Sequence, residues 1–371
     1  MKILETVKYY EPSNGGMETV VKSIVNGVSL LDDNIHFSIY SNHNFVNNKF
    51  EKSSFNNITI IKERTPFIFK SQPLQFCYPY LKKNLDKFDI IHHHYPFPNM
   101  EINLLRFKEI IKKRKFIITW HANINNSRWT LFEKIYNPLI SNLLTIVDKV
   151  VVTSDQLVQE SNLLNKFANK IDVIPLSFDP IFENNSITAK SFRINEKFKI
   201  LFVGKLRKYK GINYLIDAIK DLDVTLTIVG NGEEKESLIA QATILNISHK
   251  ITFLSDCSNS AVIDEYRSAN IFVLPSINEA EAFGVVQLEA MANGLPVINT
   301  NLNSGVPFVS LDSLTGFTVE PQNVYQLKNA ILKLMNNPVL YTEYSKNSIL
   351  RSKIFSRDTM SKKYLKVYKS I

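Results

Sequence analysis

The sequence predicts an α/β protein made of two doubly wound domains, each built on a mostly parallel sheet. The chain has 371 residues, which is too long for one compact core and fits two domains. Short apolar, β-branched runs recur along the chain at intervals that leave room for a helix between them. Several are almost continuously apolar, as expected for parallel strands covered on both faces. Such alternation of strands and helices is typical of doubly wound sheets.

The predicted strands fall into two sets separated by a linker. Residues 178–197 are polar and non-periodic, and we interpret them as that linker. The linker divides an N-terminal domain, 1–177, from a C-terminal domain, 198–340. Because ligands of open parallel sheets bind outside the carboxyl ends of the strands, we expect the active site in a cleft between the domains. The predicted strands are 2–7, 35–41, 58–63, 88–94, 115–121, 148–154 and 171–176 in the first domain, and 199–204, 226–230, 250–255, 271–276 and 296–300 in the second.

Residues 341–371 combine an apolar stripe with a strong positive charge. The stripe predicts a helix that docks on a core. The segment holds eight Lys or Arg against two acids, so it contributes +6 to the formal net charge of +9. Attraction to an anionic membrane surface and an ordinary solvated basic face both explain this charge. No nucleic-acid module is recognisable, so nucleic acid is not an expected partner. The stripe is Met360, Tyr364, Val367, Tyr368 and Ile371.

Composition excludes several classes of protein. Hydrophobic residues make up 44% and charged residues 21%, a balance typical of soluble globular proteins. No apolar run is long enough to span a bilayer, and the first residues are too soon polar for a secretory signal, so a cytoplasmic location is expected. The two cysteines, Cys77 and Cys257, lie in different predicted domains without metal-ligand spacing. Neither a disulfide nor a structural zinc site is predicted.

Residues 271–296 predict an anion site with a carboxylate on each side. A strand and an acidic loop precede a helix expected to open at Ala282, Phe283 and Gly284, and exposed amides at a helix start bind phosphate. Glu281 precedes this start, and Glu289 lies five residues inside, about 7 Å along the axis. A diphosphate there would place the carboxylates beside two flanking sugars, which is the layout of a nucleotide sugar. The alternative is an ordinary crossover with solvated glutamates.

These residues resemble the retaining glycosyltransferases of family four, which have the GT-B fold of two Rossmann-like domains. Glu281 and Glu289, with seven residues between them, match that family's signature, as do the surrounding sequences EAFG and EAMANGLPVI. The resemblance implies retaining transfer of a hexose without a metal or cofactor. The implied donor is a UDP-sugar, with GDP-mannose as the alternative. The implied catalytic residues are Glu281, Lys210 and His121, and the implied donor-binding residues are Gly16, Lys205, Arg207, Phe283, Gly284, Val285 and Glu289.

The stretch GKLRKYKG, 204–211, follows a predicted strand and precedes a predicted helix. Cations on such a turn neutralise the charge that builds up on a leaving diphosphate. The stretch is similar to the family's pair of diphosphate-gripping cations, and Lys210 matches the lysine. The arginine position holds Lys205, a point charge where arginine offers a planar fork, and Arg207 is the other candidate.

Four histidines belong to two predicted strands of the first domain. His121 ends the predicted strand 115–121, and the resemblance implies that it hydrogen-bonds the donor sugar; a structural role is the alternative. His92, His93 and His94 suggest a metal cluster at first sight. Successive strand residues point to opposite faces, so all three cannot converge on one ion, and metal is rejected. One of the three is expected to line the acceptor side.

Three loops complete the resemblance. Gly15 and Gly16 allow close approach of backbone to ligand, although a simple turn explains them equally well. Residues 299–321 are similar to the family's closing segment, and Ser255 stands where the family has a glycine beside the base.

The resemblance also implies partners. They are a nucleotide sugar and a glycan acceptor, lipid-linked, in O-antigen or capsule synthesis, with peripheral attachment to an anionic membrane surface. The segment 341–371 is expected to pack back on the N-terminal domain. The alternatives are a sugar-nucleotide epimerase on the same fold and a non-catalytic glycan-binding scaffold.

Overall fold

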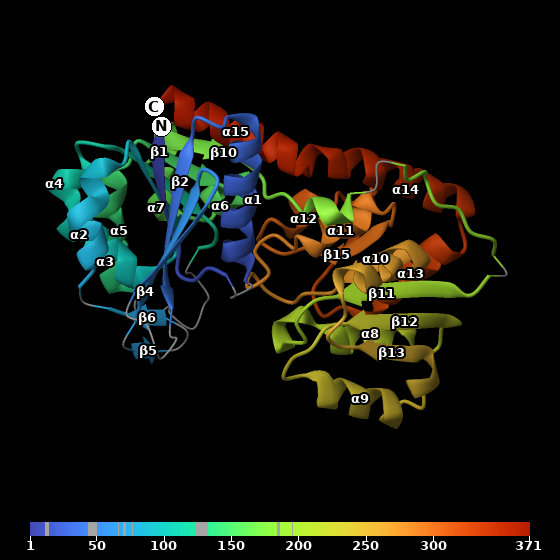
Figure 1. Ribbon diagram of the computed structural model, residues 1–371. Coiled ribbons are helices and arrows are strands. Elements are labelled where there is room, and N and C mark those ends of the chain that lie inside the picture. The colour runs from blue at the N-terminus through green and yellow to red at the C-terminus, as the bar shows by residue number, and fades with distance from the viewer. Residues whose placement is uncertain are drawn as a thin grey trace. The chain divides into compact units, whose positions relative to one another are not determined.

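The chain folds into two compact units, shown as a computed structural model in Figure 1. Unit 1 comprises Met1–Leu176 and Arg357–Ile371, and unit 2 comprises Ser177–Ser356. Each unit is an α/β layer structure, as the sequence predicts. The structure describes residues 1–11, 15–43, 50–65, 67–69, 72–75, 77–123, 133–183, 186–194 and 196–371.

Unit 1 is built on a sheet with the strand order β10-β9-β8-β7-β1-β2-β4-β3. All neighbours are parallel except β3, which runs antiparallel to β4 at the edge. The chain moves outward from β1 on one side and from β7 on the other, so the direction of winding reverses between these two strands. The strands are β1 (Lys2–Thr6), β2 (His36–His43), β3 (Phe50–Phe55), β4 (Ile58–Arg64), β7 (Ile90–Tyr95), β8 (Lys115–Trp120), β9 (Lys149–Val152) and β10 (Ile171–Val173).

Helices and a short ribbon connect the strands of unit 1. They are α1 (Gly16–Leu31), the ribbon β5 (Phe67–Phe69) and β6 (Gln72–Leu74), α2 (Pro79–Asn84), α3 (Pro98–Arg106), α4 (Lys108–Ile111), α5 (Glu133–Ile146), α6 (Asp155–Gln159) and α7 (Asn162–Asn165).

Unit 2 has a fully parallel sheet with the order β13-β12-β11-β14-β15-β16. Its winding reverses between β11 and β14, and such switch points are where open parallel sheets bind ligands. The strands are β11 (Phe198–Val203), β12 (Val224–Val229), β13 (Ile251–Leu254), β14 (Ile271–Leu274), β15 (Val297–Thr300) and β16 (Gly316–Val319). The helices are α8 (Ile212–Ile219), α9 (Lys235–Ile244), α10 (Asn259–Ser268), α11 (Val286–Ala292), α12 (Val306–Val309), α13 (Val324–Met335) and α14 (Pro338–Ser352).

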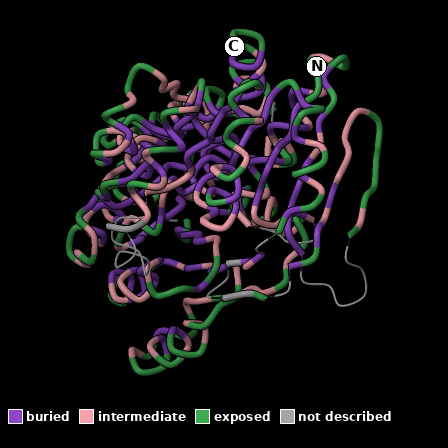
Figure 2. The backbone as a smooth tube through the Cα atoms, turned by 90° about the vertical axis from the view of Figure 1, so that its left-hand side faces the viewer, coloured by how far each residue is buried: buried purple, intermediate pink, exposed green. Residues whose placement is uncertain are grey.

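The central strands are buried on both faces, which explains the continuous apolar sequence of β14. Every residue of β7, β14 and β15 is buried. Figure 2 shows buried positions following the strands and exposed positions following the outer turns. Edge strand β3 is mostly exposed and lacks an apolar pattern, so sequence reasoning missed it. Each predicted strand is otherwise present within a few residues.

The C-terminal segment divides between the units, which differs from the predicted single segment 341–371. Helix α14 stays in unit 2, where Ser345 Oγ donates to the carbonyl of Gly294 (2.6 Å). Helix α15 (Arg357–Ser370) belongs to unit 1 and packs on α1, with Ser361 against Gly27 so closely that a Cβ on Gly27 would lie 1.9 Å from the serine Oγ. Within the residues that the structure describes, no helix has the length and apolar character that a membrane crossing requires.

Candidate active site

The turn after β11 is held against the loop after β14 by glycine. Gly211 has φ +64°, and a Cβ there would lie 2.2 Å from the carbonyl oxygen of Pro275. Only glycine tolerates both the left-handed conformation and this contact. The amide of Ile277 donates to the carbonyl of Tyr209 (2.8 Å), which ties the loop to the short helix η5 (Lys208–Lys210). The segments that follow β11 and β14 are therefore held together at the switch point of unit 2.

Two predicted catalytic residues meet there. The ammonium of Lys210 donates to Glu281 Oε2, and both side chains are buried, with 7% and 8% of each residue exposed. Ser276 Oγ donates to the same oxygen over 3.0 Å. Because removing one partner of a buried ion pair leaves an uncompensated charge, each residue holds the other in place. The sequence predicts both residues for the site but does not predict this contact, nor Ser276.

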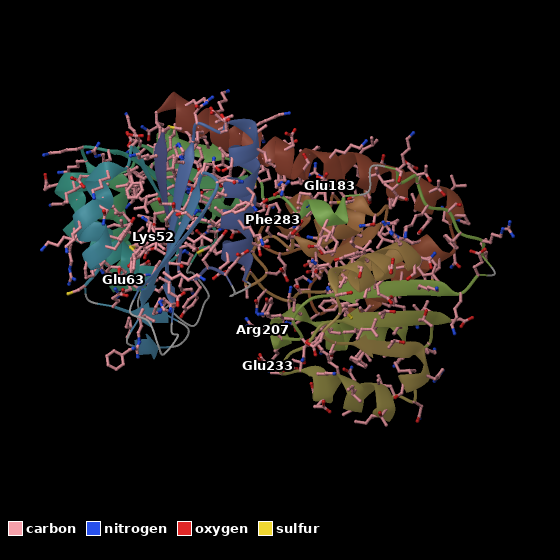
Figure 3. All side chains as sticks on the ribbon, in the orientation of Figure 1. Lys52, Glu63, Glu183, Arg207, Glu233 and Phe283 are labelled. Atoms are coloured by element: carbon pink, nitrogen blue, oxygen red, sulfur yellow. The ribbon has the colours of Figure 1, made fainter. Side chains whose placement is uncertain are left out.

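The other predicted cations lie on the surface of the same turn. Lys205 and Arg207 are exposed on either side of the buried Leu206, and neither forms an ion pair with a described residue. Figure 3 shows Arg207 and Glu233 on neighbouring loops of unit 2. Both cations are therefore free to reach an anion.

The start of α11 differs from its prediction. The helix begins at Val286, not at 282–284, because Gly284 adopts φ +71°, which is incompatible with an α-helix. Among the described residues, the amides of Gly284, Val285 and Val286 have no hydrogen-bond partner. The ring of Phe283 is buried against Phe308 and Phe355, with centroids 6.4 and 6.2 Å away. Phe283 can therefore offer a ligand only its backbone.

Glu289 occupies a different environment from Glu281. It lies in the first turn of α11, where Tyr266 Oη donates to its Oε2 (2.8 Å). Burial raises the pKa of Glu289 to about 7, because its effect outweighs the lowering by the Tyr266 hydrogen bond, and Asp179 adds a smaller raising contribution. Sequence reasoning missed Tyr266, which lies 23 residues away on α10, and assigned Asp179 to the linker. No local motif marks either residue.

The raised pKa of Glu289 predicts a pH dependence of stability. Between the ordinary value of 4.5 and about 7, the native carboxyl holds a proton that the unfolded chain has lost. This contribution to the free energy of unfolding is therefore present below pH 4.5 and is lost as pH rises through 7. We expect Glu289→Gln, which cannot ionise and therefore resembles the protonated carboxyl, to lose this pH dependence. Urea unfolding of both proteins at pH 5, 6, 7 and 8 measures it; parallel curves over that range would contradict the assignment.

Unit 1 contains a second polar cluster, at its own switch point. Glu5 on β1 faces His92 and His94 on β7, and all three are buried. His92 Nδ1 lies 3.1 Å from Glu5 Oε1, and His94 Nε2 lies 2.8 Å from Glu5 Oε2. His93 points to the opposite face, where it contacts Glu101. The three histidines therefore do not converge, as the sequence argument states.

Glu5, His92 and His94 nevertheless form a compact group that the sequence does not predict. Each of these residues offers one atom that could bind a metal, and the three atoms all lie within 4.8 Å of one another. His92 and His94 are alternate residues of β7, so their side chains point to the same face of the sheet, where they meet Glu5 of the neighbouring strand β1. Each ring nitrogen of the two histidines contacts a protein atom. His92 Nε2 lies 2.7 Å from Thr119 Oγ1 and His94 Nδ1 lies 2.9 Å from His121 Nε2. The group is thus a continuous hydrogen-bonded network.

His121 lies directly after β8, at one end of this network. Its ring stacks on that of His94, with centroids 5.2 Å apart. Burial and the neighbouring His94 hold the pKa of His121 well below its usual value, and burial lowers that of His94 to about 4. Burial alone would raise the pKa of Glu5, but His92 and His94 together lower it to about 2. At neutral pH His94 and His121 are therefore neutral and Glu5 is ionised.

The predicted glycine and closing loops are also visible. Gly16 is the first residue of α1, and a Cβ there would meet nothing within 4 Å, so packing does not require glycine at this position. Pro12–Asn14 of the same loop lie outside the described residues. Gly305, in the segment 299–321, donates its amide to the carbonyl of Ala282 (2.7 Å), which fixes that segment beside the start of α11. Ser255 accepts a hydrogen bond from Lys235 Nζ (2.9 Å).

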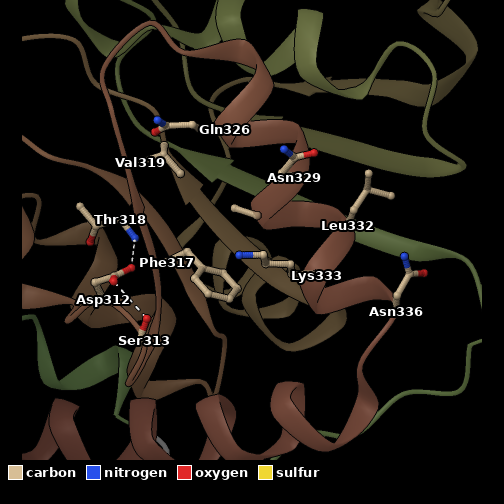
Figure 4. A pocket seen from close by; sticks show the side chains of 11 residues that line it. Asp312, Ser313, Phe317, Thr318, Val319, Gln326, Asn329, Leu332, Lys333 and Asn336 are labelled. Atoms are coloured by element: carbon tan, nitrogen blue, oxygen red, sulfur yellow. Dashed lines mark hydrogen bonds between the residues drawn. The ribbon is translucent and has the colours of Figure 1, made fainter.

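A cavity of about 640 Å³ lies elsewhere in unit 2, between β16 and α13 (Figure 4). The carboxylate of Asp312 on its wall accepts hydrogen bonds from the amide of Thr318 (2.8 Å) and the hydroxyl of Ser313 (3.0 Å). Lys333 Nζ lies 5.3 Å from the centre of the Phe317 ring. None of the predicted site residues lines this cavity.

Comparison with known proteins identifies the family. Residues 14–181 match the family described as Glycosyltransferase Family 4, and residues 184–351 match Glycosyl transferases group 1. The chain is 27% identical to the O-antigen chain mannosyltransferase C of Escherichia coli, over 100% of this chain and 99% of the relative. It is 29% identical to a D-rhamnosyltransferase of Pseudomonas aeruginosa, over 71% of this chain and 68% of the relative.

Solved structures agree on the fold. The structure of Anabaena HepE in complex with UDP has a TM-score of 0.77 and 18% identity, covering 100% of both chains. Sucrose-phosphate synthase from Thermosynechococcus elongatus has a TM-score of 0.76 and 20% identity, covering 99% of this chain and 98% of that one. The fold is therefore GT-B. With both halves of the sequence matched, the chain belongs to the glycosyltransferases of family four.

Proposed function

We propose that this glycosyltransferase moves a hexose from a nucleotide diphosphate sugar to a glycan acceptor, with retention of configuration, in the synthesis of a surface polysaccharide. The names of the O-antigen and D-rhamnosyl relatives support this acceptor class. The UDP-bound structure supports UDP as the nucleotide, whereas a mannosyl relative supports GDP-mannose. The observation that carries the proposal is the buried Lys210–Glu281 pair at the switch point of unit 2.

The proposed roles follow from the chemistry of each group. The diphosphate competes with Glu281 for the ammonium of Lys210, and Lys205 or Arg207 supplies a second cation. The amides of Gly284 and Val285 donate to a phosphate oxygen.

The remaining groups bind the two sugars. Glu281 accepts hydrogen bonds from the transferred sugar and Glu289 from the ribose. Gly16 gives the sugar room, and His121 contacts it.

The reaction needs no protein nucleophile. The bond between the anomeric carbon and the phosphate oxygen breaks while the acceptor oxygen bonds to the same face of that carbon. The acceptor proton moves to the departing phosphate oxygen. Lys210 stabilises the charge that accumulates on the leaving diphosphate, which is the largest electrostatic demand of the step.

Thermal unfolding in the presence of UDP- and GDP-sugars tests the donor, because a ligand that binds the folded state raises Tm by mass action. Transfer to an acceptor glycan is then followed by NMR of the anomeric proton, with and without EDTA. We expect one nucleotide series to stabilise the protein, an α-linked product from an α-linked donor, and activity that survives EDTA. Inverted product, or a chelated enzyme rescued by Mg²⁺ or Mn²⁺, would contradict retention or metal independence. Interconversion of the donor without acceptor would indicate the epimerase instead.

We further propose peripheral attachment to an anionic membrane surface, where a lipid-linked acceptor would lie. Helix α15 exposes Lys362, Lys363, Lys366 and Lys369. Lys362 pairs with Asp358 and Lys369 pairs with Asp32, each over 2.7 Å, so only part of this charge is offset. A basic residue near anionic lipid contributes about 1 kcal/mol.

We therefore expect the protein to sediment with phosphatidylserine-containing liposomes at low salt and to be released at 1 M salt, where the Debye length falls to about 3 Å. Replacing Lys363 and Lys366 with Gln should weaken the binding, since neither forms an ion pair with a described residue. The same change at the exposed Lys82 and Lys83 of α2 is the matched control. Equal loss of liposome binding in both double variants, or no binding at low salt, would show that the basic face of α15 is only solvated and does not attach the protein to a membrane.

A further inference from the structure

A chain of hydrogen bonds crosses unit 1 from α15 to the end of β8. Tyr368 Oη donates to Glu5 Oε1 (3.0 Å), and Glu5 Oε2 contacts His94 Nε2 (2.8 Å). His94 Nδ1 in turn contacts His121 Nε2 (2.9 Å). Glu5, His94 and Tyr368 are buried, and only His121 is partly exposed. These hydrogen bonds thus connect the buried carboxylate of Glu5 to His121, a predicted site residue.

The charge of Glu5 dictates the direction of every bond. An ionised carboxylate only accepts hydrogen bonds, so His94 donates from Nε2. A neutral imidazole has one donor and one acceptor, and His94 Nδ1 is therefore an acceptor. His121 must then donate from Nε2, which leaves an unprotonated Nδ1 on its ring. The tautomer of His121 is set by a carboxylate that it does not touch.

The hydrogen bonds of this network leave one nitrogen of His121, Nδ1, unused. Among the described residues nothing hydrogen-bonds to His121 Nδ1, while its Nε2 is used by His94. The stacked ring of His94 and the extended end of β8 hold the imidazole plane in place. An acceptor nitrogen in a fixed orientation suits a hydroxyl donor.

We propose that Glu5 and His94 are positioning residues which hold His121 as the Nε2–H tautomer, so that Nδ1 accepts a hydrogen bond from one hydroxyl of the donor sugar. This proposal rests on the proposed function. The contact of His121 with the sugar belongs to that function, and the new element is that Glu5 and His94 determine which nitrogen of His121 accepts the hydrogen bond. It also gives the buried Glu5, which sequence reasoning read only as part of an apolar strand, a role in recognition.

The opposite face of the same strand provides a matched control. His93 also contacts a buried carboxylate, that of Glu101, over 3.1 Å, and its other nitrogen contacts Thr6 Oγ1 over 2.8 Å. Glu5→Gln and Glu101→Gln thus make the same change beside neighbouring histidines. The bonds described for His93 do not lead to His121.

Long-range ¹⁵N NMR of the histidine-labelled full chain reads the tautomers directly, without substrate. We expect His121 in the wild type to show one protonated nitrogen, Nε2, and this state to be retained in Glu101→Gln. In Glu5→Gln the amide offers both a donor and an acceptor, so we expect a mixed or reversed tautomer. A wild-type His121 protonated at Nδ1, or an unchanged spectrum in Glu5→Gln, would overturn the relay. Thermal unfolding verifies that each variant is folded.

Kinetics test the contact with the sugar. An Asn side chain places its oxygen near the position of Nδ1, whereas a Gln side chain reaches the position of Nε2. We therefore expect His121→Asn to retain more activity than His121→Gln, by about tenfold, the range of one neutral hydrogen bond. Wild type should also discriminate against one monodeoxy donor, and His121→Ala should lose this discrimination. Equal activity of the two variants, or unchanged discrimination, would refute the contact. An enzyme that transfers no sugar would refute the proposed function, while the NMR result would still decide the relay.

Discussion

Lys210→Ala should lower the rate of glycosyl transfer by about a hundredfold or more, the range observed when one group that stabilises transition-state charge is removed. The ammonium is buried beside Glu281, in a place where no solvent cation can substitute for it at full strength. Initial rates at saturating donor measure the effect. Lys208→Ala is the matched control, because Lys208 belongs to the same short helix but is exposed.

The Lys210 experiment needs one further variant, because the mutation also leaves Glu281 buried without its cation. Such a loss destabilises a protein by about 3–5 kcal/mol. The double variant Lys210→Met with Glu281→Gln removes both charges, and we expect it to recover stability in urea unfolding but not activity. Recovery of activity in this folded double variant would show that Lys210 acts only by holding the site together.

The second large effect is expected to separate the two glutamates. Glu289→Ala should weaken the binding of free UDP or GDP by about tenfold or more, since a hydrogen bond to a charged group contributes about 1.5–3 kcal/mol and ribose is present in every nucleotide. Glu281→Gln should lower turnover while free nucleotide still binds, because its proposed partner is the transferred sugar. Calorimetric titration with the free nucleotide measures the first effect and steady-state rates the second. Equal loss of nucleotide affinity in both variants would reject this division of roles.

The fold could be predicted because central parallel strands are buried on both faces and are therefore rich in apolar residues. Strand β14 is a continuous apolar run, and the polar stretch 178–197 marks where one unit gives way to the next. Edge strand β3 is mostly exposed, so its composition carries no such signal. The start of α11 was misplaced because Gly284 reads as an ordinary loop glycine until its backbone conformation is known.

Motif reasoning found members of the candidate site but not their contacts. Lys210 and Glu281 come from motifs that lie 71 residues apart, and only the neighbouring positions of β11 and β14 bring them together. The same holds for Glu5 and His94, which are 89 residues apart on adjacent strands. Tyr266 is a further example, because a helix residue in an unremarkable sequence supplies the hydrogen bond to Glu289. Contacts that depend on strand order are invisible in local patterns.

The return of α15 to unit 1 has a consequence for synthesis on the ribosome. Unit 1 consists of two stretches with all of unit 2 between them, whereas unit 2 is one continuous stretch. Tyr364 and Tyr368 form hydrogen bonds with the buried Thr119 and Glu5, respectively, and they emerge from the ribosome only after unit 2. Unit 2 can therefore complete its core first, although most of unit 1 precedes it. A nascent chain that stops near residue 356 leaves the α15-facing side of α1 uncovered, and such transiently exposed apolar surface is what chaperones protect.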